Sequence, residues 1–514
     1  MERMIGLKPN IGDIYCVYVE QLQRYAACQV TRIKEKWGKP LAAVLELDWT
    51  GDKLPTEEEL DKMKPLYCDH FSNDQLEHWY VNPQVPKHYI LAGNRPPLVT
   101  EDTSRYSGWH TGSSMVYQLK WRGIPEDRRR SFKEAERDNT PVVVGGVQMA
   151  RSTSEIRDAT LQQLSDLSEL KQLPCLTRIA ADRPYESLLS YVNDNPFIYE
   201  LRLENHGYTS IDLRSSSLAR LILQADGLEE LFLNKGLTFL SLTGTPSPKL
   251  KIHAEDGGQC LTAAFTNNVP PVCGLERLSG LHVKQVKDLD LGPLVRSYPQ
   301  LKELLLEGKP GNIVNLQQLE QLTNLRLFST YDMFGFSGEA FPGPERLPNL
   351  TWLWMESLPA DAAKAIKDKY KKEAPKGLDL SITKPRKPEW LAENFNNPFR
   401  DWDGRDNITE ARAKKAMNLY KKTLAAITAL AEQIRGGGMT AAEAESALDT
   451  LVSAYTETFN KMDRRSGFIE TVEREEIYMV LKDLLSGAQE QLSAAGVEVD
   501  VDKLFDTFNE LRDF

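Results

Sequence analysis

The sequence lacks long apolar runs, paired cysteines and the common catalytic motifs, and each absence narrows the range of functions. No apolar run reaches the ~20 residues that a membrane-spanning helix needs, and no signal-peptide segment follows the first residues. Six cysteines occur without Cys-x-x-Cys spacing, which is typical of reduced thiols. A phosphate-binding loop and a Gly-x-Ser-x-Gly turn are both absent. We therefore expect a cytoplasmic protein that does not bind membranes.

An excess of basic residues is also missing. The 514-residue chain carries 63 lysines and arginines against 74 aspartates and glutamates, a formal net charge of −11. General nucleic-acid binders need a basic face that displaces counterions. The acidic balance thus argues against nucleic acid as a partner and suits a partner that is itself basic.

Recognisable metal-ligand sets are lacking too. Cys68, His70 and His78 do not complete the four ligands of a tetrahedral zinc site. Residues 463–473 resemble the end of a calcium loop, but its first and third positions would be Met462 and Arg464, which carry no carboxylate. We expect a tight turn between two helices there, and no metal or other cofactor.

The sequence does contain a recurring L-x-x-L-x-L pattern over residues 176–380. Turn-forming residues separate the copies, so the pattern does not fit the 3.6-residue period of an amphipathic helix. One copy cannot bury its own leucines, and stacked copies must share a core, which predicts a leucine-rich-repeat solenoid. The clearest copies are Leu218-Leu221-Leu223, Leu228-Leu231-Leu233, Leu278-Leu281-Val283, Leu301-Leu304-Leu306, Leu322-Leu325-Leu327 and Leu350-Leu353-Met355.

The repeats have two spacings. In the first half, aliphatic pairs recur about every ten residues, which predicts strands on both walls of a flattened solenoid. In the second half the repeat is 21 to 28 residues long, one strand and one return segment each. The strand leucines of that half are taken as Leu281, Leu304, Leu325, Leu353 and Leu378.

The residues before the repeats predict a separate domain. Residues 1–105 alternate as strands do and are rich in β-branched and aromatic side chains, which predicts a small β-barrel-like domain. Thr56 followed by Glu59 indicates the start of a helix within it. Residues 106–150 are expected to form a linker or extension. The solenoid is then expected over residues 151–383, beginning with a helical cap at 154–173.

The composition changes after the repeats. Residues 384–408 are expected to be a second linker, and 409–514 a bundle of four amphipathic helices. From Arg386 onward 24 acidic residues outnumber 17 basic ones, so most of the net charge lies there. Some bacterial effectors carry a cysteine-dependent ubiquitin-ligase domain after leucine-rich repeats, but no cysteine follows Cys273 here, so that chemistry is excluded. The fold class is α+β.

Two stretches of the N-terminal domain carry a family resemblance. They are Ile11-Gly12-Asp13-Ile14, with the tyrosine-bearing strand pair that follows it, and residues 88–97, His-Tyr-Ile-Leu-Ala-Gly-Asn-Arg-Pro-Pro. Together they resemble a bacterial immunity-protein family whose members are encoded beside polymorphic and Rhs toxins. The chain departs from that family in its longer acidic helix and its large repeat array. The resemblance implies a domain that either binds a toxin or caps the solenoid.

The repeat pattern also predicts a binding surface. In L-x-x-L-x-L the leucines point inward, so the intervening strand residues point outward onto one wall. Trp352 and Trp354 flank Leu353 and should project together, and exposed tryptophan near arginine is typical of interface hot spots. The alternative is that the C-terminal bundle or its linker covers this wall. The predicted contact residues are Phe232, His282, Leu305, Glu307, Arg326, Phe328, Trp352, Trp354 and Glu356.

These observations favour a protein that acts by binding, without catalysis. The leading hypothesis is an immunity protein that neutralises a cognate toxin, itself possibly basic, by occluding it, as a monomer or a toxin-bound heterodimer. The alternative is a leucine-rich-repeat scaffold or adaptor for cellular protein partners. A weaker third hypothesis is an enzyme that uses the polar N-terminal region, which would require a pocket with convergent titratable groups.

Overall fold

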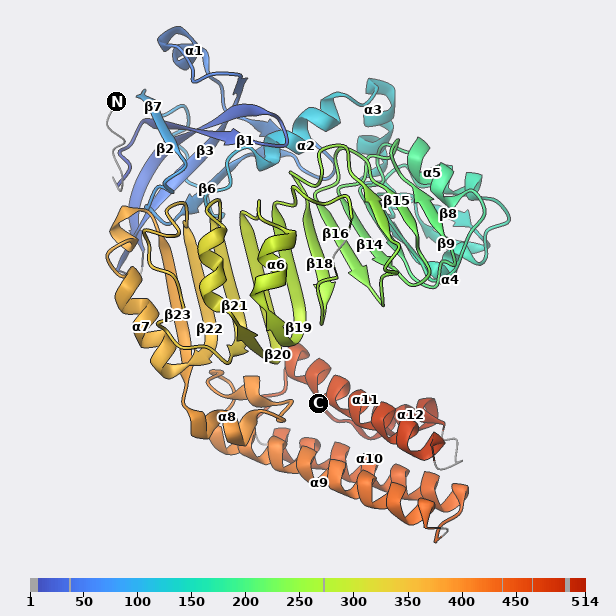
Figure 1. The fold of residues 1–514 in the computed structure, drawn as a ribbon. Helices are drawn as coiled ribbons and strands as arrows, with labels where there is room; N and C mark the ends of the chain where they lie inside the picture. The colour runs from blue at the N-terminus through green and yellow to red at the C-terminus, as the bar shows by residue number, and fades with distance from the viewer. Residues whose placement is uncertain (1–7, 37, 271–272, 437, 465, 495–499) are drawn as a thin grey trace. The chain divides into compact units, whose positions relative to one another are not determined.

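The computed structural model describes residues 8–36, 38–270, 273–436, 438–464, 466–494 and 500–514. The chain divides into two compact units, residues 1–386 and 387–514, and Figure 1 traces both. None of the helices in the described residues combines the length and the apolarity that crossing a membrane requires.

The first unit begins with an open antiparallel sheet of five strands, in the order β6-β3-β2-β1-β7. Because β6 and β7 are edges, the sheet does not close, and the expected barrel is not confirmed. The strands are β1 (Asp13–Val19), β2 (Arg24–Lys36), β3 (Lys39–Gly51), β6 (His78–Val81) and β7 (Ile90–Asn94). Helix α1 (Glu57–Lys62) has the predicted capping box of Thr56 and Glu59, and β4 (Tyr67–Cys68) pairs with β5 (Gln75–Leu76).

Residues 106–150 are not a linker. They form helices α2 (Ser113–Arg122) and α3 (Glu126–Ala135) and a hairpin of β8 (Pro141–Val144) and β9 (Val147–Ala150). Trp121 of α2 and Phe132 of α3 are buried together, with ring centroids 5.5 Å apart. Both rings also pack on Phe197, which precedes β12, so apolar side chains fix this segment to the repeat array.

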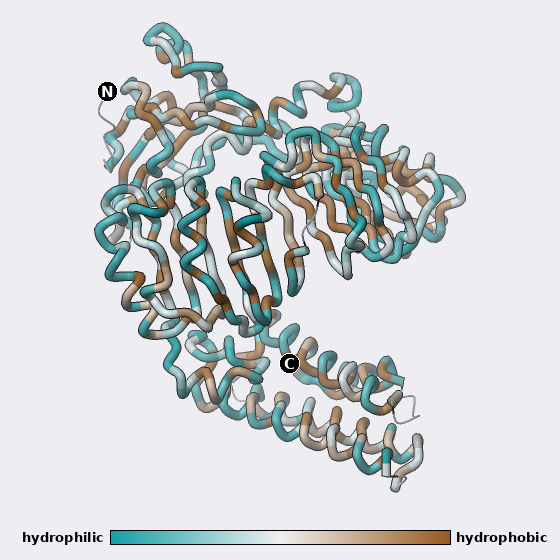
Figure 2. The backbone as a smooth tube through the Cα atoms, in the orientation of Figure 1, coloured by the Kyte–Doolittle hydropathy of each residue, from teal (hydrophilic) through white to brown (hydrophobic). Residues whose placement is uncertain are grey.

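The repeat array is built on an eleven-stranded, wholly parallel sheet, which confirms the solenoid. Leucine-type side chains point inward at every second strand position, so one continuous core runs through the array. Figure 2 shows the apolar segments recurring along successive strands. In sheet order the strands are β10 (Glu155–Ile156), β11 (Arg178–Ala181), β12 (Glu200–Leu203), β14 (Arg220–Gln224), β16 (Phe239–Thr243), β18 (Thr262–Thr266), β19 (Gly280–Asp290), β20 (Glu303–Val314), β21 (Leu327–Phe334), β22 (Trp352–Pro359) and β23 (Asp379–Arg386).

The return segments form the second wall. In the first half they are strands of a three-stranded parallel sheet, which confirms the prediction of strands on both walls. Elsewhere they are short helices. The second-wall elements are β13 (Ser210–Asp212), β15 (Glu230–Phe232), β17 (Lys251–His253), α4 (Asp158–Leu161), η1 (Leu167–Gln172), α5 (Leu188–Asp194), α6 (Leu291–Ser297), η2 (Leu316–Gln321), α7 (Ala360–Tyr370) and η3 (Ala374–Lys376).

The start of the array differs from the prediction. Residues 154–173, expected to be a helical cap, are the first repeat itself, because β10 joins the sheet in register with β11. The hairpin of β8 and β9 covers the open end instead, with Val144 fully buried in the repeat core. The leucines of a short return segment are spaced like those of an amphipathic helix, which explains why the sequence predicts a helical cap here.

The N-terminal domain lies along the edge of the array where the strands begin (Figure 1). At one end of that edge the ring of Phe71 lies 5.7 Å from that of Tyr199, which precedes β12. In the middle Lys302 forms an ion pair with Glu20 of the β1–β2 turn, and at the far end Lys87 lies 3.5 Å from Glu373. The domain therefore contacts the array from its first repeats to its last, rather than capping one end.

The second unit is helical. Its elements are α8 (Pro388–Asn394), η4 (Arg400–Trp402), α9 (Glu410–Arg435), α10 (Ala441–Asp463), α11 (Thr471–Ser493) and α12 (Val501–Leu511). The four predicted helices are confirmed. Residues 384–408 are not a linker, because β23 extends to Arg386, and Phe399, Trp402 and Ile408 lie in the core of the bundle. A turn follows α10, and Glu473 in the first turn of α11 accepts a hydrogen bond from Arg405 at 2.8 Å.

Candidate protein-binding surface

The face of the eleven-stranded sheet opposite the core is lined by alternate strand residues. On β22, Leu353 and Met355 are buried in the core, whereas Trp352, Trp354 and Glu356 project from the other side. The parallel register aligns equivalent positions of neighbouring strands, so outward residues form columns that cross the sheet. We call this side the exposed sheet face.

The apolar part of this face is concentrated on β20, β21 and β22. Trp352 pairs in register with Leu327, and both are half-buried. In the next column Trp354 stands between Ser329 and Ser381, and 45% of it is exposed. Leu305 of β20 is in register with Ser329. The aromatic patch is defined here as Leu305, Leu327, Tyr331, Trp352 and Trp354.

Phe328 was predicted to face outward and is instead fully buried in the core. The register pairs it with Leu304, so the leucine-like motif on β21 is Leu325-x-x-Phe328-x-Thr330. The sequence pattern predicts this copy three residues too early, because a phenylalanine and a threonine occupy the strand positions of two leucines. The strand leucine of the last repeat is Leu380 rather than Leu378, because the register pairs Leu380 with Leu353.

Phe232 and Arg326 also lie outside the predicted columns. Phe232 belongs to β15 on the second wall, where its ring stacks on His253 with centroids 4.1 Å apart. Arg326 precedes β21 and is half-buried at the edge that the N-terminal domain covers. Burial lowers the pKa of the neighbouring His88 to about 4, and the positive charge of Arg326 contributes to this shift. Neither residue lines the exposed sheet face.

The polar residues predicted for the face are present beside the aromatic patch. His282 Nε2 lies 3.9 Å from Glu307 Oε2, and burial lowers the pKa of His282, so the pair is weak at neutral pH. Glu356 binds Lys384 at 2.9 Å. These pairs surround the apolar centre with polar side chains, which is the usual arrangement of a protein interface.

The other half of the face, over β10 to β14, is charged. Arg178 binds Glu155 at 3.0 Å, and Arg220 binds Glu200 at 3.2 Å. A depression of about 460 Å³ lies among these side chains. Its charged lining consists of Glu155, Asp158, Asp182, Glu200, Glu204, Arg157, Arg178 and Arg202. Acidic groups outnumber basic ones there, which suits a basic surface on a partner.

Leu327 and Tyr331 were missed as surface residues. The sequence pattern places Leu327 in the core as the last leucine of a copy, and only the pairing of β20 with β21 shows that it faces outward. A signal was available in the spacing, since a strand residue at position 328 makes the repeat from Leu304 24 residues long, close to the 23 residues of the preceding one.

No family model matches the chain, and no curated protein matches it. Among solved structures, internalin C2 from Listeria monocytogenes is 18% identical over 37% of this chain and 72% of its own, with a TM-score of 0.17. A leucine-rich-repeat protein from Leptospira interrogans is 16% identical over 41% of this chain and 74% of its own, with a TM-score of 0.22.

Proposed function

We propose that this chain is a leucine-rich-repeat scaffold that binds a protein partner on its exposed sheet face. The observation that carries the proposal is the pair of indoles on β22, which project from one face around the buried Leu353, with Trp354 45% exposed. Leaving such a side chain in water costs free energy that burial in an interface recovers. Binding of this kind needs neither a catalytic residue nor a cofactor.

The test is capture of partners from the native host by the tagged full-length chain, followed by cross-linking to locate the contact. Trp352→Ala with Trp354→Ala should lower the recovery of a specific partner at least about tenfold, since hot-spot residues contribute ≥ 2 kcal/mol each. Tyr106→Ala is the matched control, because Tyr106 is 47% exposed but lies in the N-terminal domain. Equal recovery by the double variant and the control would refute the proposed surface.

A narrower proposal is that the partner is a bacterial toxin, which the chain neutralises by occlusion. It is supported by the pairing of the two stretches that resemble the immunity family: β1 and β7 are neighbours, and Asn94 donates to Asp13 at 2.8 Å. The acidic charge of the chain suits a basic toxin. In this proposal the chain acts in the cytoplasm as a monomer or as a heterodimer with the toxin.

Co-expression distinguishes the narrower proposal from a general scaffold. If a toxin gene adjoins the gene for this chain, the chain should restore growth to cells that express the toxin, and the double tryptophan variant should not. Growth arrest that persists with the wild-type chain would exclude neutralisation while leaving the scaffold proposal intact.

A further inference from the structure

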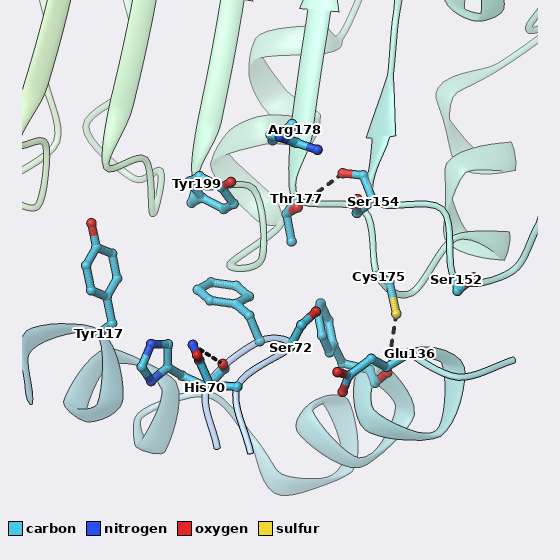
Figure 3. A pocket seen from close by; sticks show the side chains of 13 residues that line it. His70, Ser72, Tyr117, Glu136, Ser152, Ser154, Cys175, Thr177, Arg178 and Tyr199 are labelled. Atoms are coloured by element: carbon cyan, nitrogen blue, oxygen red, sulfur yellow. Dashed lines mark hydrogen bonds between the residues drawn. The ribbon is translucent and has the colours of Figure 1, made fainter. Parts of the chain in front are cut away.

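A cavity of about 500 Å³ lies where the N-terminal domain meets the first repeats. One side is formed by residues 70–73 and by Tyr117 of α2, and the other by Cys175, Thr177 and Tyr199 of the repeat array (Figure 3). We call it the junction cavity. Its volume is in the range of small-ligand sites, and its lining combines aromatic rings with a few polar groups, as such sites usually do.

The wall of the junction cavity contains a strained residue. Phe71 has φ +48°, a conformation that is unfavourable for a bulky side chain. It is held there by the Lys133 ammonium, which donates to the carbonyl oxygens of Phe71 at 2.5 Å and of Asn73 at 2.8 Å. In this conformation the ring of Phe71 lies against that of Tyr199, with centroids 5.7 Å apart. Backbone strain that its surroundings enforce is concentrated at ligand-binding sites.

The hydrogen bonds of His70 fix its tautomer. Gln118 donates its amide nitrogen to Asp69 and accepts from the Asp69 backbone N–H at 3.0 Å, so its orientation is determined. The same Gln118 oxygen lies 3.0 Å from His70 Nδ1, which must therefore carry the proton. Burial lowers the pKa of His70, which favours the neutral ring. Among the described residues no side chain or backbone group donates to Nε2, which is left as an acceptor on a ring that lines the cavity.

The cavity thiol is not suited to covalent chemistry. Cys175 Sγ donates to the carbonyl oxygen of Phe132 at 3.3 Å, and burial raises its pKa to about 11. The Glu136 carboxylate forms an ion pair with Lys133, with Nζ 3.2 Å from Oε2. A thiol that stays protonated at neutral pH is a poor nucleophile. These features favour reversible binding over an enzymatic role for the cavity.

Arg178 connects the junction cavity with the exposed sheet face. Its side chain lines both the cavity and the charged depression over β10 to β14. The junction cavity therefore adjoins this half of the exposed sheet face.

We propose that the junction cavity binds a tryptophan or tyrosine side chain of the protein partner, with the ring packed against Phe71, Tyr117 and Tyr199 and its N–H or O–H donated to His70 Nε2. The inference rests on the proposed binding function and adds a specificity site to it. Phenylalanine would fill the same space but leave the acceptor without a donor.

The probe for the test is N-acetyl-tryptophanamide, an uncharged mimic of tryptophan within a polypeptide, titrated into the full-length chain by ligand-observed NMR. Its analogue methylated on the indole nitrogen has the same ring without the donor and should bind about fivefold more weakly, as expected for one hydrogen bond. Tyr199→Ala should weaken both probes about threefold to tenfold through loss of ring packing.

The variant His70→Phe isolates the donor. It keeps a ring beside Tyr117, and we expect it to bind the two probes equally, an effect that a general loss of structure would not produce. Tyr106→Ala serves as the control and should change neither affinity. Failure of the probe to saturate, or preference for the indole N–H that survives in His70→Phe, would overturn the inference. Tighter binding of free tryptophan than of its amide would assign the cavity to an amino-acid ligand and would also overturn it.

The same variants separate this inference from the proposed function. Trp352→Ala with Trp354→Ala should abolish partner capture but leave probe binding unchanged. If instead the probe fails to bind while capture still depends on the two tryptophans, the junction cavity is excluded and the exposed sheet face is retained.

Discussion

Glu46 shows how one residue can make stability depend on pH. It is fully buried on β3, where its Oε1 accepts from the backbone N–H groups of Gly112 at 2.9 Å and Met115 at 3.3 Å. Burial raises its pKa from 4.5 to about 8, and nearby Glu77 adds to the effect, although the two backbone hydrogen bonds oppose it. The folded protein therefore holds a proton that the unfolded chain releases.

Protonated Glu46 contributes its full stabilisation below pH 4.5, and this stabilisation is lost as the pH rises towards 8. We expect the stability of the wild type relative to Glu46→Gln to fall by about 1.4 kcal/mol per pH unit within this window. Urea unfolding followed by tryptophan fluorescence at several pH values measures this difference in the free energy of unfolding. Histidines contribute equally to wild type and variant, so their titration cancels in the difference. Glu58→Gln alters an exposed carboxylate and is the control. Parallel curves for wild type and Glu46→Gln would contradict the prediction.

Phe328 and Trp354 form a matched pair that tests the strand register. Phe328 is fully buried in the repeat core, so Phe328→Ala should cost about 3–5 kcal/mol through lost burial and the cavity left behind. Trp354 is 45% exposed, and Trp354→Ala should cost less than about 1 kcal/mol. Chemical denaturation of both variants measures the difference. Similar losses of stability would mean that β21 or β22 has a different register.

At the scale of elements, the hairpin of β8 and β9 closes the first repeat. Its turn residues Gly145 and Gly146 have φ +58° and +72°, the two positive values that a tight two-residue hairpin turn requires. Val144 is fully buried against the repeat core, and Gln172 of the first return segment donates to the carbonyl oxygen of Val143 at 3.1 Å. An open repeat would expose its leucines, so the hairpin contributes to the stability of the array.

Neighbouring valines provide the test of this cap. Val144→Asp places a carboxylate in the core and should destabilise the first unit by at least about 3 kcal/mol. Val143 is 58% exposed, so Val143→Asp should leave stability within about 0.5 kcal/mol of the wild type. Hydrogen exchange should show lost protection over β10 and β11 in the first variant alone. Full protection of both strands in Val144→Asp would show that the cap lies elsewhere.

At the scale of the molecule, the sequence predicted the repeating elements but not the elements of residues 106–150 or the way the parts assemble. Period-2 leucine patterns predicted the solenoid and both of its walls, and the 3.6-residue period predicted α9 to α12. Contacts such as Phe71 with Tyr199 or Glu20 with Lys302 join residues more than a hundred positions apart, and no local pattern indicates them. The junction cavity depends on such contacts and could not be predicted. The exposed sheet face follows from alternation, and its residues on β19, β20 and β22 were predicted. The prediction was wrong at Phe328, which takes the place of a core leucine, at Phe232, which lies on the second wall, and at Arg326, which precedes its strand.

The second unit offers the sharpest test of a domain boundary. Trp402 is buried in the bundle core and donates its indole N–H to Glu476 at 2.9 Å, while Arg405 binds Glu476 at 2.6 Å. The segment before α9 is thus part of the bundle, in contrast to the linker that its proline and aromatic content suggested. These hydrogen bonds join the segment directly to α11.

Two fragments distinguish these alternatives. Residues 387–514 should fold alone and unfold cooperatively, whereas 409–514 should be less stable by about 3–5 kcal/mol, because loss of Phe399 and Trp402 empties part of the core. Circular dichroism during urea unfolding of both fragments gives the comparison, with Trp402→Ala in the longer fragment as an intermediate case. Equal stability of the two fragments would mean that residues 387–408 do not stabilise the bundle and that the domain begins at α9.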